Sequence, residues 1–133
     1  MYGCKPTTSE VGMAIQEVRV VSVPVSDQER AKEFYVEKLG FELSREDDSI
    51  PGIRWVQVTP KGGATSLTLV TWFETMPPGS LQGLVLGSAD LEKDCEELVA
   101  RGVEFDRPLQ DQPWGKEAVV RDPDGNRLVL QQA

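Results

Sequence analysis

The chain contains one strand-helix-strand pattern twice, and this internal repeat restricts the folds that it can adopt. A β-branched run over residues 18–25 is followed by Ser26 and Glu29, which are spaced as in a helix-initiating capping box. Apolar residues then recur at helical spacing until Gly40, a residue type that commonly ends helices. The same order returns after residue 84, with the N-cap and the closing glycine at Asp90 and Gly102.

Strand-like runs follow each predicted helix. They begin at residues 41 and 103, and continue over residues 53–58 and 65–72 in the first copy and 116–120 and 127–131 in the second. The fold class is therefore predicted as α+β, with two βαβββ modules. A helix covers only one face of each small sheet, so we expect the open faces of the modules to form a curved mixed-sheet trough that holds a ligand.

The same pattern sets the expected domain boundaries. Residues 1–17 form an N-terminal tail and residues 18–133 a single domain. Its modules are expected at about residues 18–73 and 82–131. The linker, residues 74–81, contains two consecutive prolines and a glycine, which favour a turn over a helix or strand.

The charge of the chain limits its partners and location. A net charge of −8 argues against nucleic acid or an anionic membrane surface and favours neutral or cationic ligands. No apolar run reaches the roughly 18 residues of a membrane span, and the tail lacks the apolar stretch of a signal peptide. Cys95 lies on the apolar stripe of the second helix and is expected to be buried, whereas Cys4 is expected to be an exposed thiol. Both suit a reducing cytoplasm, where we place the protein.

No histidine occurs among the 133 residues. A neutral imidazole is the usual ligand for borderline metals and the usual general base near neutral pH. The sequence therefore argues against a histidine-metal centre and against a serine or cysteine nucleophile activated by histidine. Cys4 and Cys95 form no metal-binding pattern either.

The order and spacing of several short segments resemble the vicinal oxygen chelate superfamily. This superfamily includes glyoxalase I, extradiol dioxygenases, and the fosfomycin and bleomycin resistance proteins. The resemblance covers about residues 18–131 and rests on residues 23–27, 33–35, 39–43, 102–105, 113–115 and 122–126. It is specific for the superfamily and not for one activity within it.

The resemblance also indicates where a metal would be held. Metal enzymes of this superfamily carry histidine on the first strand, Glu or Gln late in the first half, histidine at the start of the second half and Glu on the last strand. The matching positions here are Val20, one of Ser66, Thr68 and Val70, then Gly83 beside Gln82, and Val129. Because valine and glycine side chains cannot bind a divalent cation, we expect no metal and no cofactor.

A trough without its metal resembles the drug-sequestering resistance proteins, which are dimers with two ligand clefts at the subunit boundary. We therefore expect a non-enzymatic, cytoplasmic homodimer that sequesters a bulky aromatic antibiotic or natural product and so confers antibiotic resistance. The alternative is a metal-dependent lyase, isomerase or dioxygenase of the same superfamily, with carboxylates or Gln82 as nonstandard ligands. A metal-free catalyst with Glu117 or Glu42 as its base is a third possibility.

Strand alternation assigns side chains to the open faces of the sheets. Leu67, Leu69, Leu128 and Leu130 should face the helices. The candidate ligand-binding residues are Trp55, Trp72, Trp114, Gln57, Thr68, Val70, Val129, Gln131, Gly83 and Arg54. The tryptophans offer flat stacking surfaces, although each would equally serve as a core or dimer-interface residue. Gly83 and Gly87 either leave room for a planar ligand or ease sheet curvature.

Three features receive structural interpretations. Residues 122–126 have a glycine too early for a calcium loop and no Glu at its twelfth place, so a hairpin turn is expected. Tyr35 is expected to pack under the sheet. The acidic run at residues 46–48 is expected to be a solvated loop.

Arg54 and Trp55 are neighbours on one strand, so only one of them can face the trough.

Overall fold

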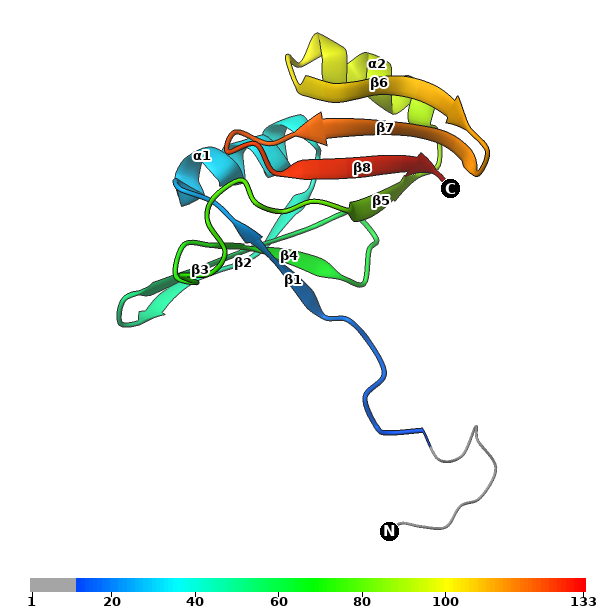
Figure 1. Ribbon diagram of the computed structural model, residues 1–133. Coiled ribbons are helices and arrows are strands. Elements are labelled where there is room, and N and C mark those ends of the chain that lie inside the picture. Colours follow the sequence, from blue (N-terminus) through cyan, green and yellow to red (C-terminus); the bar gives the residue numbers. More distant parts are fainter. Residues whose placement is uncertain (1–11) are drawn as a thin grey trace.

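The computed structural model describes residues 12–133 (Figure 1). The first module contains β1 (Val20–Pro24), α1 (Gln28–Glu33), a π-helical turn η1 (Phe34–Lys38), β2 (Glu42–Ile50), β3 (Ile53–Thr59) and β4 (Ser66–Val70). The second contains β5 (Leu84–Ser88), α2 (Leu91–Ala100), β6 (Glu104–Gln112), β7 (Gly115–Arg121) and β8 (Arg127–Gln132). The predicted α+β class and the two βαβββ modules are confirmed.

The two modules have the same sheet topology. Their strands are ordered β1-β4-β3-β2 and β5-β8-β7-β6, and the first pair of each sheet is parallel whereas the others are antiparallel. The described strands form two separate four-stranded mixed sheets. β1 and β5 therefore each lie at the edge of a sheet with one unpaired side.

Each helix begins at an aspartate. Asp27 caps α1 by accepting a hydrogen bond from the backbone nitrogen of Arg30 at 3.1 Å. The predicted capping box at Ser26 is wrong by one residue, because the Ser26 hydroxyl donates to Asp124 Oδ1 at 2.5 Å instead. The N-cap at Asp90 and the left-handed glycines that follow both helices are as predicted.

The first helix ends in a π turn. The backbone nitrogen of Leu39 donates to the carbonyl oxygen of Phe34, five residues earlier, at 3.1 Å. The wider turn places the consecutive residues Phe34 and Tyr35 in the core, with exposed fractions of 7% and 0%. Tyr35 packs beneath the sheet, as predicted.

One apolar core serves both modules. It joins the helix-side residues of the first sheet to those of the second, among them Val23, Leu67, Leu69, Leu91, Leu98, Leu128 and Leu130. The predicted inward direction of the four strand leucines is confirmed. Because both sheets turn one face toward this common core, their opposite faces point away from it, and one chain carries two outward-facing open faces.

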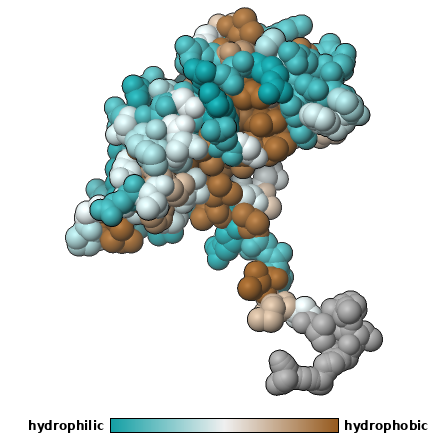
Figure 2. Space-filling view, viewed as in Figure 1, coloured by the Kyte–Doolittle hydropathy of each residue, from teal (hydrophilic) through white to brown (hydrophobic). Residues whose placement is uncertain are grey.

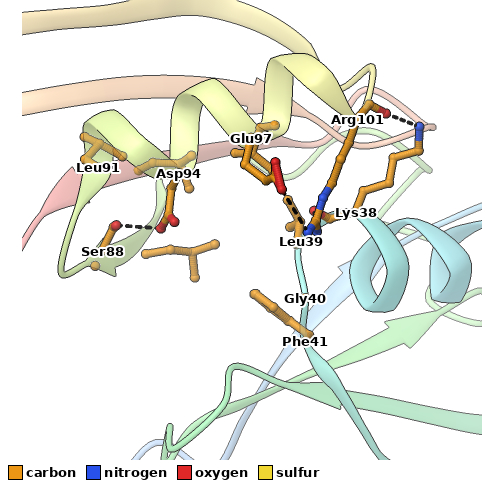
Figure 3. Close-up of a pocket in the computed structure, with 13 residues that line it drawn as sticks. Lys38, Leu39, Gly40, Phe41, Ser88, Leu91, Asp94, Glu97 and Arg101 are labelled. Carbon is orange, nitrogen blue, oxygen red and sulfur yellow. Dashed lines mark hydrogen bonds and ion pairs between the residues drawn. The ribbon is translucent and has the colours of Figure 1, made fainter.

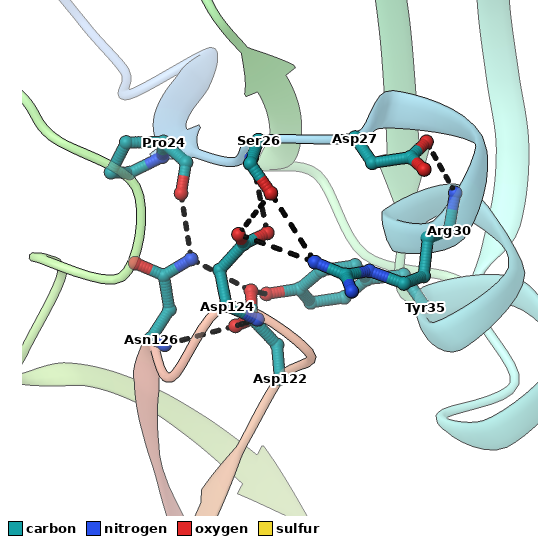
Figure 4. Close-up of polar contacts among 8 residues, drawn as sticks. All are labelled: Pro24, Ser26, Asp27, Arg30, Tyr35, Asp122, Asp124 and Asn126. Carbon is teal, nitrogen blue, oxygen red and sulfur yellow. Dashed lines mark hydrogen bonds and ion pairs between the residues drawn. The ribbon is translucent and has the colours of Figure 1, made fainter.

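The turn between β7 and β8 binds the first module through buried polar groups (Figure 4). The hydroxyl of Tyr35 donates to Asp122 Oδ2 at 2.9 Å. Asn126 Nδ2 donates to Asp122 Oδ2 at 2.7 Å and to the carbonyl oxygen of Pro24 at 2.8 Å. Burial, followed by the neighbouring Asp122 charge, raises the pKa of Tyr35 well above its usual range, so the phenol remains a donor. We call these four residues the inter-module clamp.

The linker passes against the same turn. The backbone nitrogen of Gly79 donates to the Pro24 carbonyl at 3.3 Å, and Gly79 has a φ of +84°. A Cβ at this position would overlap the backbone carbonyl oxygen of Asp124. Glycine is therefore required here both by conformation and by space.

Other predictions have mixed outcomes. The acidic run at residues 46–48 lies within β2, so the predicted loop is wrong; Glu46 accepts a hydrogen bond from Lys32 at 3.1 Å and is also bound by Arg54. Cys95 is buried, as predicted, and burial raises the pKa of its thiol. Cys4 lies outside the described residues. Within residues 12–133, each helix is too short or too polar to cross a bilayer.

Gly79→Ala is expected to lower the free energy of unfolding by about 3 kcal/mol or more, because a positive φ and a steric overlap act together. Gly62→Ala is the matched control: Gly62 has a φ of +75° but open space around its Cβ position. Its expected cost is about 1 kcal/mol. Urea denaturation measures both variants. Equal losses would contradict the close packing of the linker on the β7–β8 turn.

Tyr35→Phe is expected to lower the free energy of unfolding by about 1–3 kcal/mol, because the buried Asp122 carboxylate loses a donor. Thr65→Val is the control, since it removes a more exposed hydroxyl that donates to the Val18 carbonyl at 2.8 Å. Thermal unfolding should show a clear loss only for the first variant. Wild-type stability of Tyr35→Phe would exclude this bond as a determinant of module docking.

Candidate ligand-binding faces

The open face of the first sheet carries a row of aromatic side chains. Trp55 on β3 and Trp72, which follows β4, have ring centroids 6.2 Å apart and planes inclined by 28°. Phe73 lies next, with its centroid 5.9 Å from that of Trp72. The guanidinium of Arg45 lies 5.5 Å from the centroid of the Trp55 ring, a cation–π geometry. We call Trp55, Trp72 and Phe73 the aromatic wall.

β3 and β4 separate at the point where the aromatic wall stands. They pair at only two positions, Gln57 with Thr68 and Val58 with Leu67. Beyond these pairs, the side-chain amide of Gln28 on α1 bridges the strands. It donates to the backbone carbonyl of Arg54 on β3 at 2.7 Å and to that of Leu69 on β4 at 2.8 Å. This side chain holds the spread strands together beneath the aromatic wall.

A cavity of about 440 Å³ opens beside Trp55, and it is lined by Trp55, Gln57, Arg45, Val20, Ser66, Ala64, Glu17 and Arg19. Its volume is in the range of sites for drug-sized molecules. Trp55 Nε1 donates to Gln57 Oε1 at 2.9 Å. The indole is thus held in place by its polar edge, with Trp72 and the guanidinium of Arg45 against its ring.

The open face of the second sheet is apolar at its centre. Val85 on β5 lies opposite Val129 on β8, and Val129 lies opposite Val119 on β7. Val85 is 48% exposed, so this row of valines is open to solvent at the β5 edge. The second sheet therefore offers an aliphatic surface where the first offers an aromatic one.

A polar cluster closes one end of the second face. Glu117 Oε1 accepts hydrogen bonds from Trp114 Nε1 and Gln131 Nε2, each at 2.9 Å, and Arg107 lies 3.6 Å from Oε2. The bonds from Gln131 and Trp114 hold the pKa of Glu117 below its usual range. Such a carboxylate is a weak base near neutral pH, so the cluster is suited to hydrogen bonding more than to proton abstraction.

The candidate residues fall on two separate faces. Trp55, Trp72, Gln57, Thr68 and Val70 lie on or beside the first sheet, and Trp114, Val129, Gln131 and Gly83 lie on or beside the second. Arg54 belongs to neither open face, because it turns toward α1 and binds Glu29 and Glu46. The prediction that Arg54 lines the ligand face is therefore wrong.

Gly83 has a conformational reason to be glycine, in addition to the two roles that the sequence suggested. It immediately precedes β5 and has a φ of +82°, a conformation that side chains disfavour. The backbone alone therefore accounts for glycine at this position. Gly87 lies on the open face, where an added Cβ would only touch the side chain of Ala133.

The register identifies the four positions that the resemblance assigns to a metal. Thr68 and Val129 occupy equivalent places on β4 and β8, since each follows a leucine that pairs with a core valine. Val20 and Gly83 are equivalent as well. Val20 lies two residues before Ser22, which pairs with Thr68, and Gly83 lies two residues before Val85, which pairs with Val129. In the described part of the chain, His, Cys, Asp and Glu form no group of three that could hold an ion.

A second cavity, of about 290 Å³, lies on the helix side between the modules (Figure 3). Leucines form much of its lining, and charged residues surround them. These charges already have partners: Lys38 donates to the Arg101 carbonyl at 2.6 Å, Glu97 pairs with Arg101 at 3.5 Å, and Ser88 donates to Asp94 at 2.7 Å. The cavity therefore presents few polar groups free to recognise a ligand.

Sequence reasoning missed two residues of the first face, Ser22 and Arg45. Ser22 lies opposite Thr68, and Arg45 lies opposite Gln57. The alternation of Val21, Ser22 and Val23 carried a usable signal for Ser22. Arg45 was harder to assign, because an irregularity between Leu43 and Arg45 shifts the register of β2.

The chain matches the family model of the Glyoxalase/Bleomycin resistance protein/Dioxygenase superfamily over residues 17–130. The chain is similar to TnmS3, an antibiotic binding protein from Streptomyces sp. CB03234 whose crystal structure is known. The two sequences are 55% identical, the match covers 91% of this chain and 98% of TnmS3, and the TM-score is 0.86. A glyoxalase/bleomycin resistance protein from the same organism is 53% identical, with coverages of 87% and 100% and a TM-score of 0.79.

A curated relative agrees with these matches. The uncharacterized protein YetH of Bacillus subtilis (strain 168) is 33% identical over 121 residues, which cover 89% of this chain and 99% of YetH. The matched family spans nearly all of the two modules described above. The chain belongs to the glyoxalase/bleomycin resistance protein/dioxygenase superfamily.

Proposed function

We propose that this protein binds a bulky aromatic antibiotic or natural product and releases it unchanged, so that sequestration confers resistance in the cytoplasm. The observation that carries the proposal is the aromatic wall beside a cavity of about 440 Å³ on the open face of the first sheet. A flat ligand gains most by stacking on such a surface. The similarity to TnmS3, described as an antibiotic binding protein, supports this class of ligand.

We also propose that the binding unit is a homodimer. The common core directs both open faces of one chain outward, so a second copy is needed to place a second-sheet face opposite a first-sheet face. β1 and β5 each have an unpaired edge and carry an exposed valine, Val20 and Val85 respectively. Figure 2 shows apolar surface on the face of the molecule in view. Pairing of such edges between two copies would bury them.

The residues present favour binding over catalysis. The four positions matched to a metal site carry Val20, Thr68, Gly83 and Val129, whose side chains supply at most one neutral oxygen. Glu117, the carboxylate of the second face, has a lowered pKa because Gln131 and Trp114 donate to it. A base tuned for proton abstraction would require the opposite shift.

Affinity for a non-titrating aromatic ligand is expected to stay constant between about pH 6 and pH 8. The chain has no histidine. The pKa values of Glu117 and Asp47 are lowered from those of ordinary carboxyl groups, so both side chains are ionised throughout this pH interval. Protonation would begin only as the pH falls through those lowered values. Binding titrations at several pH values measure this, and an affinity that changes within this range would contradict the expectation, because a titrating group would then be coupled to binding.

Trp55→Ala and Trp72→Ala are each expected to weaken binding by about tenfold, because each removes stacking area. Saturable quenching of tryptophan fluorescence against a panel of aromatic antibiotics identifies the ligand, and calorimetry then compares the variants. Val99→Ala, on an exposed position of α2, is the control and should bind normally. Unaltered binding by both tryptophan variants would place the site elsewhere.

A further inference from the structure

The two open faces differ at equivalent positions. Across the first sheet, Ser22, Thr68, Gln57 and Arg45 lie in one transverse row, since each pairs with the next across β1, β4, β3 and β2. Across the second sheet, the equivalent row is Val85, Val129, Val119 and Arg107. Paired residues of neighbouring strands project from the same face. Three polar side chains in one module thus stand where the other has three valines.

The centre of the polar row holds an unpaired hydroxyl. Thr68 is 1% exposed, and its Oγ1 has no hydrogen-bond partner within the described residues. A buried hydroxyl without a partner destabilises a fold, and the valine at the equivalent position of the second sheet shows that this topology accepts an aliphatic side chain there. The fold does not account for the threonine.

The neighbours of Thr68 retain capacity for a ligand. Gln57 uses its amide oxygen to accept from Trp55 at 2.9 Å, which leaves the amide nitrogen to donate. Arg45 pairs with Asp47 at 3.3 Å, but its side chain is 55% exposed and lies over the Trp55 ring, so its other N–H groups can donate to a ligand. Contact with Thr68 requires the longer side chains of the row to move aside, as side chains at binding sites commonly do.

We infer that the row of Ser22, Thr68, Gln57 and Arg45 recognises an oxygen-bearing edge of a planar aromatic ligand, with Thr68 as the residue that distinguishes a ring carrying a carbonyl from the same ring without it. The inference rests on the proposed binding function and adds the chemical class of ligand. The polar row binds the oxygenated edge, the aromatic wall takes the ring, and the valine row of a second copy covers the apolar side.

Two planar probes with the same ring skeleton test this assignment, 2-(aminomethyl)fluorenone and 2-(aminomethyl)fluorene, which differ by a ring carbonyl in place of a methylene and carry no other oxygen. Calorimetric titration of the wild-type protein, Thr68→Val and Thr68→Ser gives the affinities, and thermal unfolding gives the stabilities. Thr68→Val should bind the carbonyl probe about tenfold more weakly and the methylene probe unchanged. Thr68→Ser should bind both as the wild type does, and Thr68→Val should melt at the same or a higher temperature.

The alternative outcomes separate this inference from the proposed function. Equal affinity of wild type and Thr68→Val for the carbonyl probe overturns the role of Thr68 while leaving a binding cleft in place. A marked loss of stability in Thr68→Val overturns it too, because the hydroxyl would then serve the fold or the contact between copies. If the wild type binds neither probe but binds an aromatic antibiotic that Thr68→Val binds equally well, the ligand class is wrong. If it binds no aromatic molecule at all, the proposed function fails and this inference falls with it.

Discussion

The arrangement of the two modules depends on the hydrogen bonds that the buried Asp122 carboxylate accepts. It is buried in the turn between β7 and β8 and accepts from Tyr35 of the first module and from Asn126 of its own turn. Asn126 in turn donates to the Pro24 carbonyl. A buried charge is stable only with such partners, so the modules are held in the one relative position that supplies them. The shared core and the outward direction of both open faces follow from this docking.

Much of the fold was predictable because it depends on local patterns. The apolar periodicity, the aspartate at the start of α2 and the glycines after the helices identified both modules from the sequence. Two errors arose where a distant contact overrode the local preference. Ser26 bonds to Asp124, 98 residues away, and Glu46 joins Arg54 and Lys32 in a charged cluster that keeps an acidic run in a strand.

The candidate site was predictable in part, and for a similar reason. Alternation along β4 placed Thr68 and Val70 on the open face, because successive side chains of a regular strand point to opposite faces of the sheet. It could not place Arg45, whose strand is irregular, or decide between Arg54 and Trp55, which required the ion pairs of Arg54 with α1. That the two sheets stay separate within one chain depends on docking between modules, which leaves no periodic signal in the sequence.

The clamp also has a consequence for biosynthesis. Pro24 and Asn126 are separated by 102 positions, so the hydroxyl of Tyr35 lacks Asp122, and the carbonyl of Pro24 lacks its second donor, until the β7–β8 turn has left the ribosome. During synthesis, the helix-side apolar surface of the first module therefore stays uncovered until the β7–β8 hairpin has been made. Truncation near the C-terminus would leave the N-terminal half without its closure, exposed to chaperones and proteases.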